Sequence, residues 1–223
     1  MNKNSLFKEP LTWLVALGGS VAIAIPLIID YQTPRIMSGL LTDISESDQP
    51  YKKELVEICQ ANLEHLKDND ISIVGKFADK VKIEKNQEYD QRDRFNLQKD
   101  CENITSPPSD LGKTPGTDLQ QAVIMLKQEI DQQHTVNKKY RIAVIINVQA
   151  AEPVNHKNSD LQVIRKTTEE ITKDGSAVVF IGPDAWLQQD LKTALVGVKN
   201  TQVCSYKDGK NCVNWAFNTA RGK

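Results

Sequence analysis

The chain has 223 residues, of which 39% are hydrophobic and 26% are charged, and its formal net charge at pH 7 is -1. This length and composition are sufficient for one globular domain with a hydrophobic core, plus a short additional segment. Lysine and arginine are scattered, without a basic run or interleaved aromatic residues. The chain therefore lacks the charge pattern of a nucleic-acid-binding protein, and we expect no nucleic-acid partner.

Residues 1–31 are predicted to form an N-terminal tail and one transmembrane helix. Residues 11–29 contain no charged side chain, and a helix of this length spans a hydrocarbon layer of about 30 Å. The apolar run is long for a cleaved signal peptide, and no A-x-A-like site precedes Asp30, so an uncleaved signal anchor is favoured. Lysines before the helix place the N-terminus in the cytoplasm by the positive-inside rule. Residues 35–223 are then expected to be extracytoplasmic, in the periplasm or at the cell exterior.

Alternating apolar segments after residue 35 predict an α/β fold. Strands are predicted at 36–41, 71–77, 80–84, 142–146 and 177–181, and helices at 50–67, 119–130, 161–171 and 183–195. The strand at 142–146 is apolar without alternation, as expected at the centre of a parallel sheet, whereas 80–84 is expected at an edge. This order implies a doubly wound, mainly parallel sheet, in which ligands bind at the carboxyl ends of the strands.

Two further segments interrupt or end this alternation. Residues 85–115 are polar, contain Pro107-Pro108, and are predicted to be an insertion with a short helix near 92–101. Residues 201–217 are predicted to form a C-terminal hairpin with Gly209 in its loop. The inward side chains of this hairpin and of the helix before it are expected to be Trp186, Leu187, Leu191, Val203, Val213, Trp215 and Phe217.

The predicted hairpin places Cys204 and Cys212 opposite one another, and opposed strand positions can satisfy disulfide geometry. We therefore expect a disulfide between them, which agrees with an oxidising, extracytoplasmic compartment. Cys59 shares an apolar helical face with leucines, and we expect it to be a core residue and not the partner of Cys101.

A pattern with metal-binding chemistry follows the first predicted strand. Asp43, Ser45 and Ser47 form D-x-S-x-S, and a strand that ends at Asp43 would direct one carboxylate and two hydroxyl groups toward one point. Such oxygen ligands suit Mg²⁺ or Mn²⁺. Ordinary turn and helix-capping chemistry also accounts for these residue types. Thr117 likewise has two possible roles, as a metal ligand or as a helix cap, because it begins a helix and forms a T-x-x-Q capping box with Gln120.

This order of elements resembles the von Willebrand factor type A domain, whose metal-ion-dependent adhesion site takes D-x-S-x-S from the first loop and a threonine from a later loop. Residues 71–79 resemble the second strand and turn of that family, and 141–147 its fourth strand. The resemblance covers roughly residues 35–200. It implies a divalent cation, Mg²⁺ or Mn²⁺, held by Asp43, Ser45, Ser47, Thr117 and Asn147.

Asn147 departs from the family, which usually has an aspartate at the end of the fourth strand. Asparagine keeps a carbonyl oxygen but removes one negative charge, so weaker metal binding is expected. Glu152, in the following loop, is an alternative source of that charge.

Together with the predicted membrane helix, the resemblance implies a membrane-anchored binding module, not an enzyme, in which the cation leaves one position for an acidic side chain of a partner protein. A metal-free scaffold of the same fold in a membrane assembly is an alternative, and Asn147 favours it. A Mg²⁺-dependent phosphatase of the haloacid dehalogenase class fits less well, because it requires an acidic residue where this chain has Ser45. The sequence leaves the partner's identity and the oligomeric state open.

Overall fold

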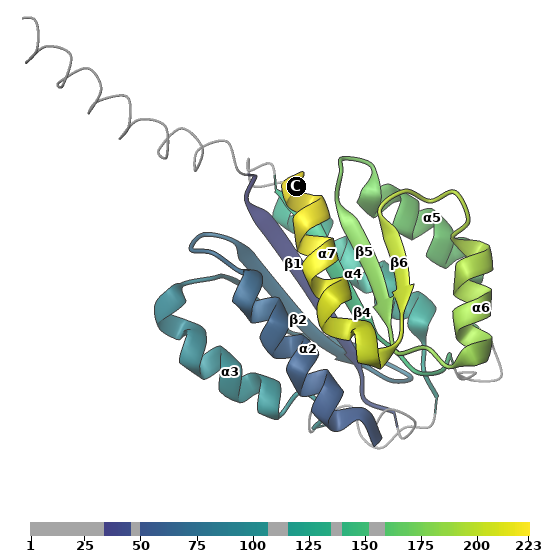
Figure 1. Ribbon diagram of the computed structural model, residues 1–223, viewed down its shortest axis with the longest axis horizontal. Helices are drawn as coiled ribbons and strands as arrows, with labels where there is room; N and C mark the ends of the chain where they lie inside the picture. Colours follow the sequence, from purple (N-terminus) through teal and green to yellow (C-terminus); the bar gives the residue numbers. More distant parts are fainter. Residues whose placement is uncertain (1–33, 46–49, 107–115, 135–139, 152–158) are drawn as a thin grey trace, which may run out of the picture. The chain divides into compact units, whose positions relative to one another are not determined.

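The parallel sheet predicted from the apolar segments is present in the computed structural model, which describes residues 34–45, 50–106, 116–134, 140–151 and 159–223 (Figure 1). Within these residues the sheet has six strands in the order β3-β2-β1-β4-β5-β6, all parallel except β3, which pairs antiparallel with β2. The strands are β1 (Ile36–Asp43), β2 (Ile71–Phe77), β3 (Val81–Glu88), β4 (Arg141–Asn147), β5 (Ala177–Ile181) and β6 (Thr201–Cys204).

Helices cover both faces of the sheet (Figure 1). One face carries α2 (Lys52–His65), α3 (Arg94–Glu102) and α7 (Gly209–Arg221), and the other carries α4 (Leu119–His134), α5 (Leu161–Thr172) and α6 (Ala185–Ala194). We call these the α2 face and the α4 face. Short 3-10 turns precede α3 and α7, at Gln91–Asp93 and Tyr206–Asp208.

The central strands are apolar on both sides because both sides are covered. In β1, Ile36 and Leu40 belong to the core of the α2 face, whereas Met37 and Leu41 belong to the core of the α4 face. Each such buried aliphatic side chain contributes about 1.5–3 kcal/mol relative to an exposed one. The same alternation places Thr42 on the α2 face and Asp43 on the α4 face at the carboxyl end of β1.

A buried ion pair ties the end of α7 to the amino-terminal ends of the strands. Arg221 Nη2 lies 3.3 Å from Asp70 Oδ2, and the two side chains are only 7% and 5% exposed. Asp70 also accepts backbone hydrogen bonds from Ile36 at 2.8 Å and from Lys67 at 2.9 Å. Burial raises the pKa of Asp70, and the two N–H groups and Arg221 oppose this shift. The pair therefore joins α7, β1 and the start of β2 in one connected arrangement.

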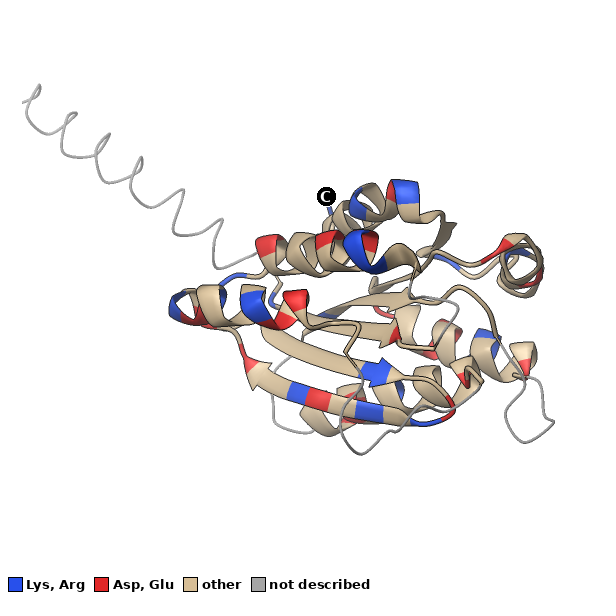
Figure 2. Ribbon diagram, turned by 90° about the horizontal axis from the view of Figure 1, so that it is seen from below, with Lys and Arg blue, Asp and Glu red and all other residues tan. Residues whose placement is uncertain are grey.

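The edge strand β3 carries charges of both signs at Lys82, Glu84, Lys85 and Glu88 (Figure 2). Charged side chains on an edge strand discourage pairing with the edge of another sheet. The edge position predicted for this strand is confirmed, although the strand runs four residues further than the sequence pattern indicated, to Glu88.

The predicted C-terminal hairpin is wrong. Only Thr201–Cys204 is a strand, and Gly209–Arg221 is the helix α7. Val213 and Phe217 are buried as predicted, but by helical spacing with Ala216 and Ala220. Gly209 has a right-handed helical φ of -52°, and a Cβ there would lie 2.8 Å from Ile58 Cδ1. The glycine therefore allows α7 to approach α2 and does not form a hairpin turn.

Two predictions about single side chains are also wrong. Cys59 is bonded to Cys101, with a Cα–Cα distance of 5.6 Å, because α3, in the polar insertion, packs against α2. Trp186 is 85% exposed, because the inner face of α6 is formed by Leu187 and Leu191 alone. The disulfide expected between Cys204 and Cys212 is present, and it links the end of β6 to the first turn of α7.

None of the helices in the described part of the chain is long and apolar enough to cross a membrane. The transmembrane helix predicted at residues 11–29 lies outside the described residues.

Candidate metal site

Asp43 and Thr117 meet at the carboxyl end of β1. The Thr117 hydroxyl donates a hydrogen bond to Asp43 Oδ2 at 3.2 Å, and both residues have no exposed surface. Asp43 follows Leu41 by two positions in β1, so its side chain points to the α4 face, where Thr117 leads into α4. The pair of residues that the sequence pattern placed in one site is thus in contact.

The backbone before Thr117 has a shape that favours glycine. Gly116 has φ 115°, in the region that L-residues rarely adopt. The capping function predicted for Thr117 belongs instead to Asp118, whose Oδ1 accepts the backbone N–H of Gln121 at 2.8 Å. The hydroxyl of Thr117 donates to Asp43, and Asp118 caps the helix.

Ser45 completes a turn around the same carboxylate. Its backbone N–H donates to Asp43 Oδ1 at 2.8 Å, and the residue is 3% exposed. The two oxygens of Asp43 therefore each accept a hydrogen bond, one from Ser45 and one from Thr117. Ser47 and Glu152 lie outside the described residues.

Asn147 does not join this group. Its Nδ2 donates to Thr42 Oγ1 at 3.3 Å, and Thr42 alternates with Leu40 on the α2 face, opposite to Asp43. The next residue, Val148, is fully buried in the core of the α4 face. Alternation along β4 therefore places an apolar residue, not Asn147, on the side of Asp43. Asn147 Oδ1 is buried and has no hydrogen-bond partner among the described residues.

A residue that the sequence analysis did not select, Asp79, lies in the loop after β2. Its Oδ1 is buried without a hydrogen-bond partner in the part of the chain that is described. Backbone bonds join this loop to the other two: Ile44 N–H donates to Phe77 O at 2.9 Å, and Asp118 N–H donates to Ala78 O at 2.7 Å. An acidic residue two positions after the end of the second strand was the available sequence signal.

The candidate site offers oxygen ligands only. Carboxylate and hydroxyl oxygens suit hard cations such as Mg²⁺ and Mn²⁺ better than soft metals. Among the described residues, no group of three or more His, Cys, Asp or Glu side chains is arranged to hold a metal, so a cation here would depend on hydroxyl ligands as well. His65 packs against Phe217 with ring centroids 4.9 Å apart, away from this edge of the sheet.

The cysteines do not supply a nucleophile. All four are in disulfides, Cys59–Cys101 and Cys204–Cys212. A cysteine nucleophile acts as the thiolate, which a disulfide sulfur cannot provide. With both disulfides formed, none of the four cysteines presents a thiolate.

The arrangement of strands and helices is similar to several solved structures. A von Willebrand factor type A protein from Catenulispora acidiphila has a TM-score of 0.56 at 11% identity over 84% of this chain and 42% of that chain. Proximal thread matrix protein 1 from the mussel byssus, with a zinc-occupied metal-ion-dependent adhesion site, has a TM-score of 0.56 at 10% identity over 84% and 48%. An aerotolerance-related membrane protein from Bacteroides fragilis has a TM-score of 0.54 at 13% identity over 82% and 98%.

These likenesses establish the fold, and the von Willebrand factor type A fold expected from the sequence is confirmed. The chain spans less than half the length of the first two structures, at 42% and 48%. No curated protein matches the sequence of this chain.

One family matches at the level of sequence, and it is described as the Peptidase C1-like family. The match covers residues 55–218, about three quarters of the chain, from α2 to α7. The chain therefore belongs to the Peptidase C1-like family, and its fold is that of the von Willebrand factor type A structures.

Proposed function

We propose that this protein is a membrane-anchored binding module of the von Willebrand factor type A kind, which uses a divalent cation to bind an acidic group of a partner protein. The contact between Thr117 and Asp43 carries the proposal. It gathers a carboxylate and a hydroxyl group from loops 74 positions apart at the edge where ligands bind in such sheets. The zinc-occupied site of the mussel protein supports a divalent cation at this place.

Asp43, Ser45 and Thr117 fit the role of cation ligands, together with Ser47 as a prediction from the sequence. Asn147 does not fit, because its amide contacts Thr42 on the opposite face. We propose that Asp79 contributes the second negative charge, since its buried Oδ1 has no partner among the described residues. A bound Mg²⁺ or Mn²⁺ would supply a positive charge with a coordination position left for a partner's carboxylate.

Membrane anchoring by residues 11–29 is part of this proposal. The aerotolerance-related structure is described as a membrane protein, and disulfides are stable in an extracytoplasmic compartment. We propose a cytoplasmic N-terminus and an extracytoplasmic domain. A protease-protection assay on sealed membrane vesicles tests this orientation, and cleavage of the domain only from the cytoplasmic side would reverse it.

Calorimetric titration of Mg²⁺, Mn²⁺ and Zn²⁺ into the full-length protein tests the metal site. We expect one binding event per chain, its loss in Asp43→Ala, a clear weakening in Asp79→Asn and no change in Asn147→Ala. Circular dichroism confirms that each variant is folded, and Thr117→Val provides a second test if Asp43→Ala is unstable. Equal binding by wild type and Asp43→Ala would refute the site.

Partner chemistry is tested separately, with peptides that differ by one group. A glutamate-containing peptide should bind in Mg²⁺ and not in EDTA, and its glutamine twin should bind in neither. Binding that persists in EDTA would contradict the metal-bridged mode.

A metal-free scaffold is the second candidate, and one observation favours it. Val148 occupies the α4 face at the end of β4, where a ligand from this strand would otherwise project toward Asp43. Absence of any metal binding in the titration, with partner association retained, would favour this function.

A further inference from the structure

A cavity of about 320 Å³ lies on the α2 face, between the sheet and α3. Its walls come from β1, β2, β3, α2, α3 and the turn after α3. The apolar lining consists of Leu40, Leu63, Val74, Leu97 and Ile104. The volume falls at the lower end of the range for small-molecule sites, about 300–1,000 Å³. The cavity is on the opposite face of the sheet from the Asp43 carboxylate and shares no residue with the candidate metal site.

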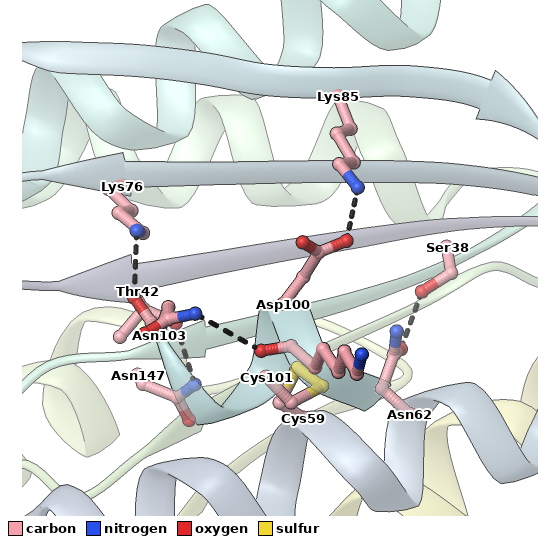
Figure 3. The surroundings of a disulfide bond; sticks show 11 residues. Ser38, Thr42, Cys59, Asn62, Lys76, Lys85, Asp100, Cys101, Asn103 and Asn147 are labelled. Atoms are coloured by element: carbon pink, nitrogen blue, oxygen red, sulfur yellow. Dashed lines mark hydrogen bonds and ion pairs between the residues drawn. A yellow bond between two sulfur atoms is a disulfide. The ribbon is translucent and has the colours of Figure 1, made fainter. Parts of the chain in front are cut away.

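The Cys59–Cys101 disulfide forms part of the wall and holds α3 against α2 (Figure 3). Leu97 and Ile104, on either side of Cys101, are 4% and 2% exposed. The outer rim is more open, with Lys85 and Asp100 34% and 50% exposed. The cavity thus has a buried apolar floor, a covalently fixed side and a polar entrance.

The charges around the cavity are already paired. Lys76 Nζ donates to the carbonyl oxygens of Asn103 at 3.0 Å and Ser106 at 2.9 Å and lies 3.2 Å from Glu84 Oε2. Lys85 and Asp100 form an ion pair across the entrance (Figure 3). A charged ligand would therefore meet no unpaired counter-charge among these residues.

Asn62 is the exception to this pairing. The residue has no exposed surface, and its Oδ1 accepts the Ser38 hydroxyl hydrogen at 2.6 Å (Figure 3). Its Nδ2 has no hydrogen-bond partner among the described residues, although Asn62 lines the cavity. A buried N–H group without a partner costs about 1–3 kcal/mol, and native proteins rarely retain one without a reason. An acceptor oxygen in the cavity, from a ligand or from a buried water, would satisfy this donor.

We propose that this cavity binds a small, uncharged, mainly apolar molecule whose carbonyl oxygen accepts a hydrogen bond from Asn62 Nδ2. The apolar lining holds the body of the molecule, and the carbonyl group satisfies the buried amide. An uncharged group is required because an ionised carboxylate would lose its hydration without gaining a counter-ion at the floor. The ligand class is therefore ketones, esters or tertiary amides.

Three probes of similar shape test the proposal with the full-length, ¹⁵N-labelled protein. Acetophenone carries the carbonyl group, ethylbenzene replaces it with a methylene, and benzoate carries a charge. We expect acetophenone to shift the backbone signals of lining residues and the side-chain amide signal of Asn62. Ethylbenzene should bind about tenfold more weakly, as expected for the loss of one hydrogen bond, and benzoate should not bind.

Two variants identify the site. Asn62→Leu should lower the affinity for acetophenone about tenfold and leave that for ethylbenzene unchanged. Val74, in β2, is partly buried, and Val74→Trp should fill the cavity and abolish binding of both acetophenone and ethylbenzene. Val196→Trp, at a residue that is 69% exposed, is the control. Thermal melting confirms that each variant is folded. If Asn62→Leu does not fold, Val74→Trp tests whether the probes bind in this cavity.

Equal affinity for acetophenone and ethylbenzene would overturn the proposal, as would binding that Val74→Trp does not affect. Absence of binding by any probe would also overturn it and would leave Asn62 Nδ2 to a buried water. Metal titration is independent of these measurements, so failure here does not bear on the Asp43 site.

Discussion

Thr117 donates its hydroxyl hydrogen to the Asp43 carboxylate at 3.2 Å, across 74 positions of sequence. The contact joins the end of the first strand to the start of α4, which otherwise belong to different layers. In the same segment Asp118, and not Thr117, caps the helix. A single hydroxyl group therefore has both a structural role and a candidate role in metal binding, and the two can be separated by experiment.

Thr117→Val should destabilise the protein by about 1–3 kcal/mol in EDTA, because Asp43 loses a buried donor while the side-chain shape is kept. Thr117→Ser restores the hydroxyl and should recover most of this loss. Urea denaturation in EDTA measures the structural effect, and repetition in Mg²⁺ measures the metal effect. Equal stability of wild type and Thr117→Val would show that the hydrogen bond contributes nothing.

The two disulfides should differ in their contribution to stability. Cys59–Cys101 closes a loop of sequence separation 42 and Cys204–Cys212 one of 8. From loop entropy, the Cys59→Ala/Cys101→Ala variant should lose about 4 kcal/mol and the Cys204→Ala/Cys212→Ala variant about 2.5 kcal/mol. Urea denaturation of the two double variants measures which of them loses more stability. Limited proteolysis should in addition cut near α3 only in the first, and a reversed order would contradict this account.

Gly182 should tolerate alanine much less well than Gly197. Both have positive φ, 93° and 81°. However, a Cβ on Gly182 would lie 2.1 Å from the ring of Tyr206, whereas one on Gly197 would meet nothing within 4 Å. Gly197→Ala should cost about 1 kcal/mol for the backbone alone.

Gly182→Ala should cost about 1–3 kcal/mol more, because the Tyr206 ring must move. That ring stacks on Tyr51 at 4.5 Å, so near-ultraviolet circular dichroism should change only in Gly182→Ala. Urea denaturation of both variants measures the difference in the free energy of unfolding. Equal losses of stability would show that the Tyr206 ring moves without an energetic penalty.

Stability should fall as pH decreases below 6.5, in part because of His65. Burial, and next the positive charge of Arg221, lower the pKa of His65 below its ordinary value of 6.5. Between that lowered pKa and 6.5, the unfolded chain binds more protons than the folded chain, so folding becomes less favourable as pH falls. Below the lowered pKa, His65 causes no further loss of stability as pH falls.

His65→Phe keeps a ring against Phe217 and removes the titrating group. Urea denaturation at pH 7.5, 6.5 and 5.5 should therefore show a shallower pH dependence in this variant than in wild type, with His134→Gln, at an exposed residue, as the control. The same slope in all three proteins would contradict a contribution from His65.

Much of the fold followed from local patterns. The strands predicted at 71–77 and 177–181 match β2 and β5 in full. A strand that is covered on both faces is recognisable from its own run of apolar residues, without knowledge of the strands that pair with it. The C-terminal segment was misjudged because Val213, Trp215 and Phe217 fit the two-residue alternation of a strand, whereas Val213 and Phe217 also fit the spacing of a helical turn. Packing of α7 against α2, β4 and β5 decides for the helix.

The sequence by itself determined that an aspartate ends the first strand and that a threonine begins a later helix at the same edge of the sheet. Only the tertiary structure decided that these two meet while Asn147 turns to Thr42, since one position along a strand reverses the face on which a side chain lies. It also decided that Cys59 bonds to Cys101 and that Asn62 faces a cavity. Both depend on how the polar insertion packs against the sheet, and such long-range packing leaves no periodic signal in the chain.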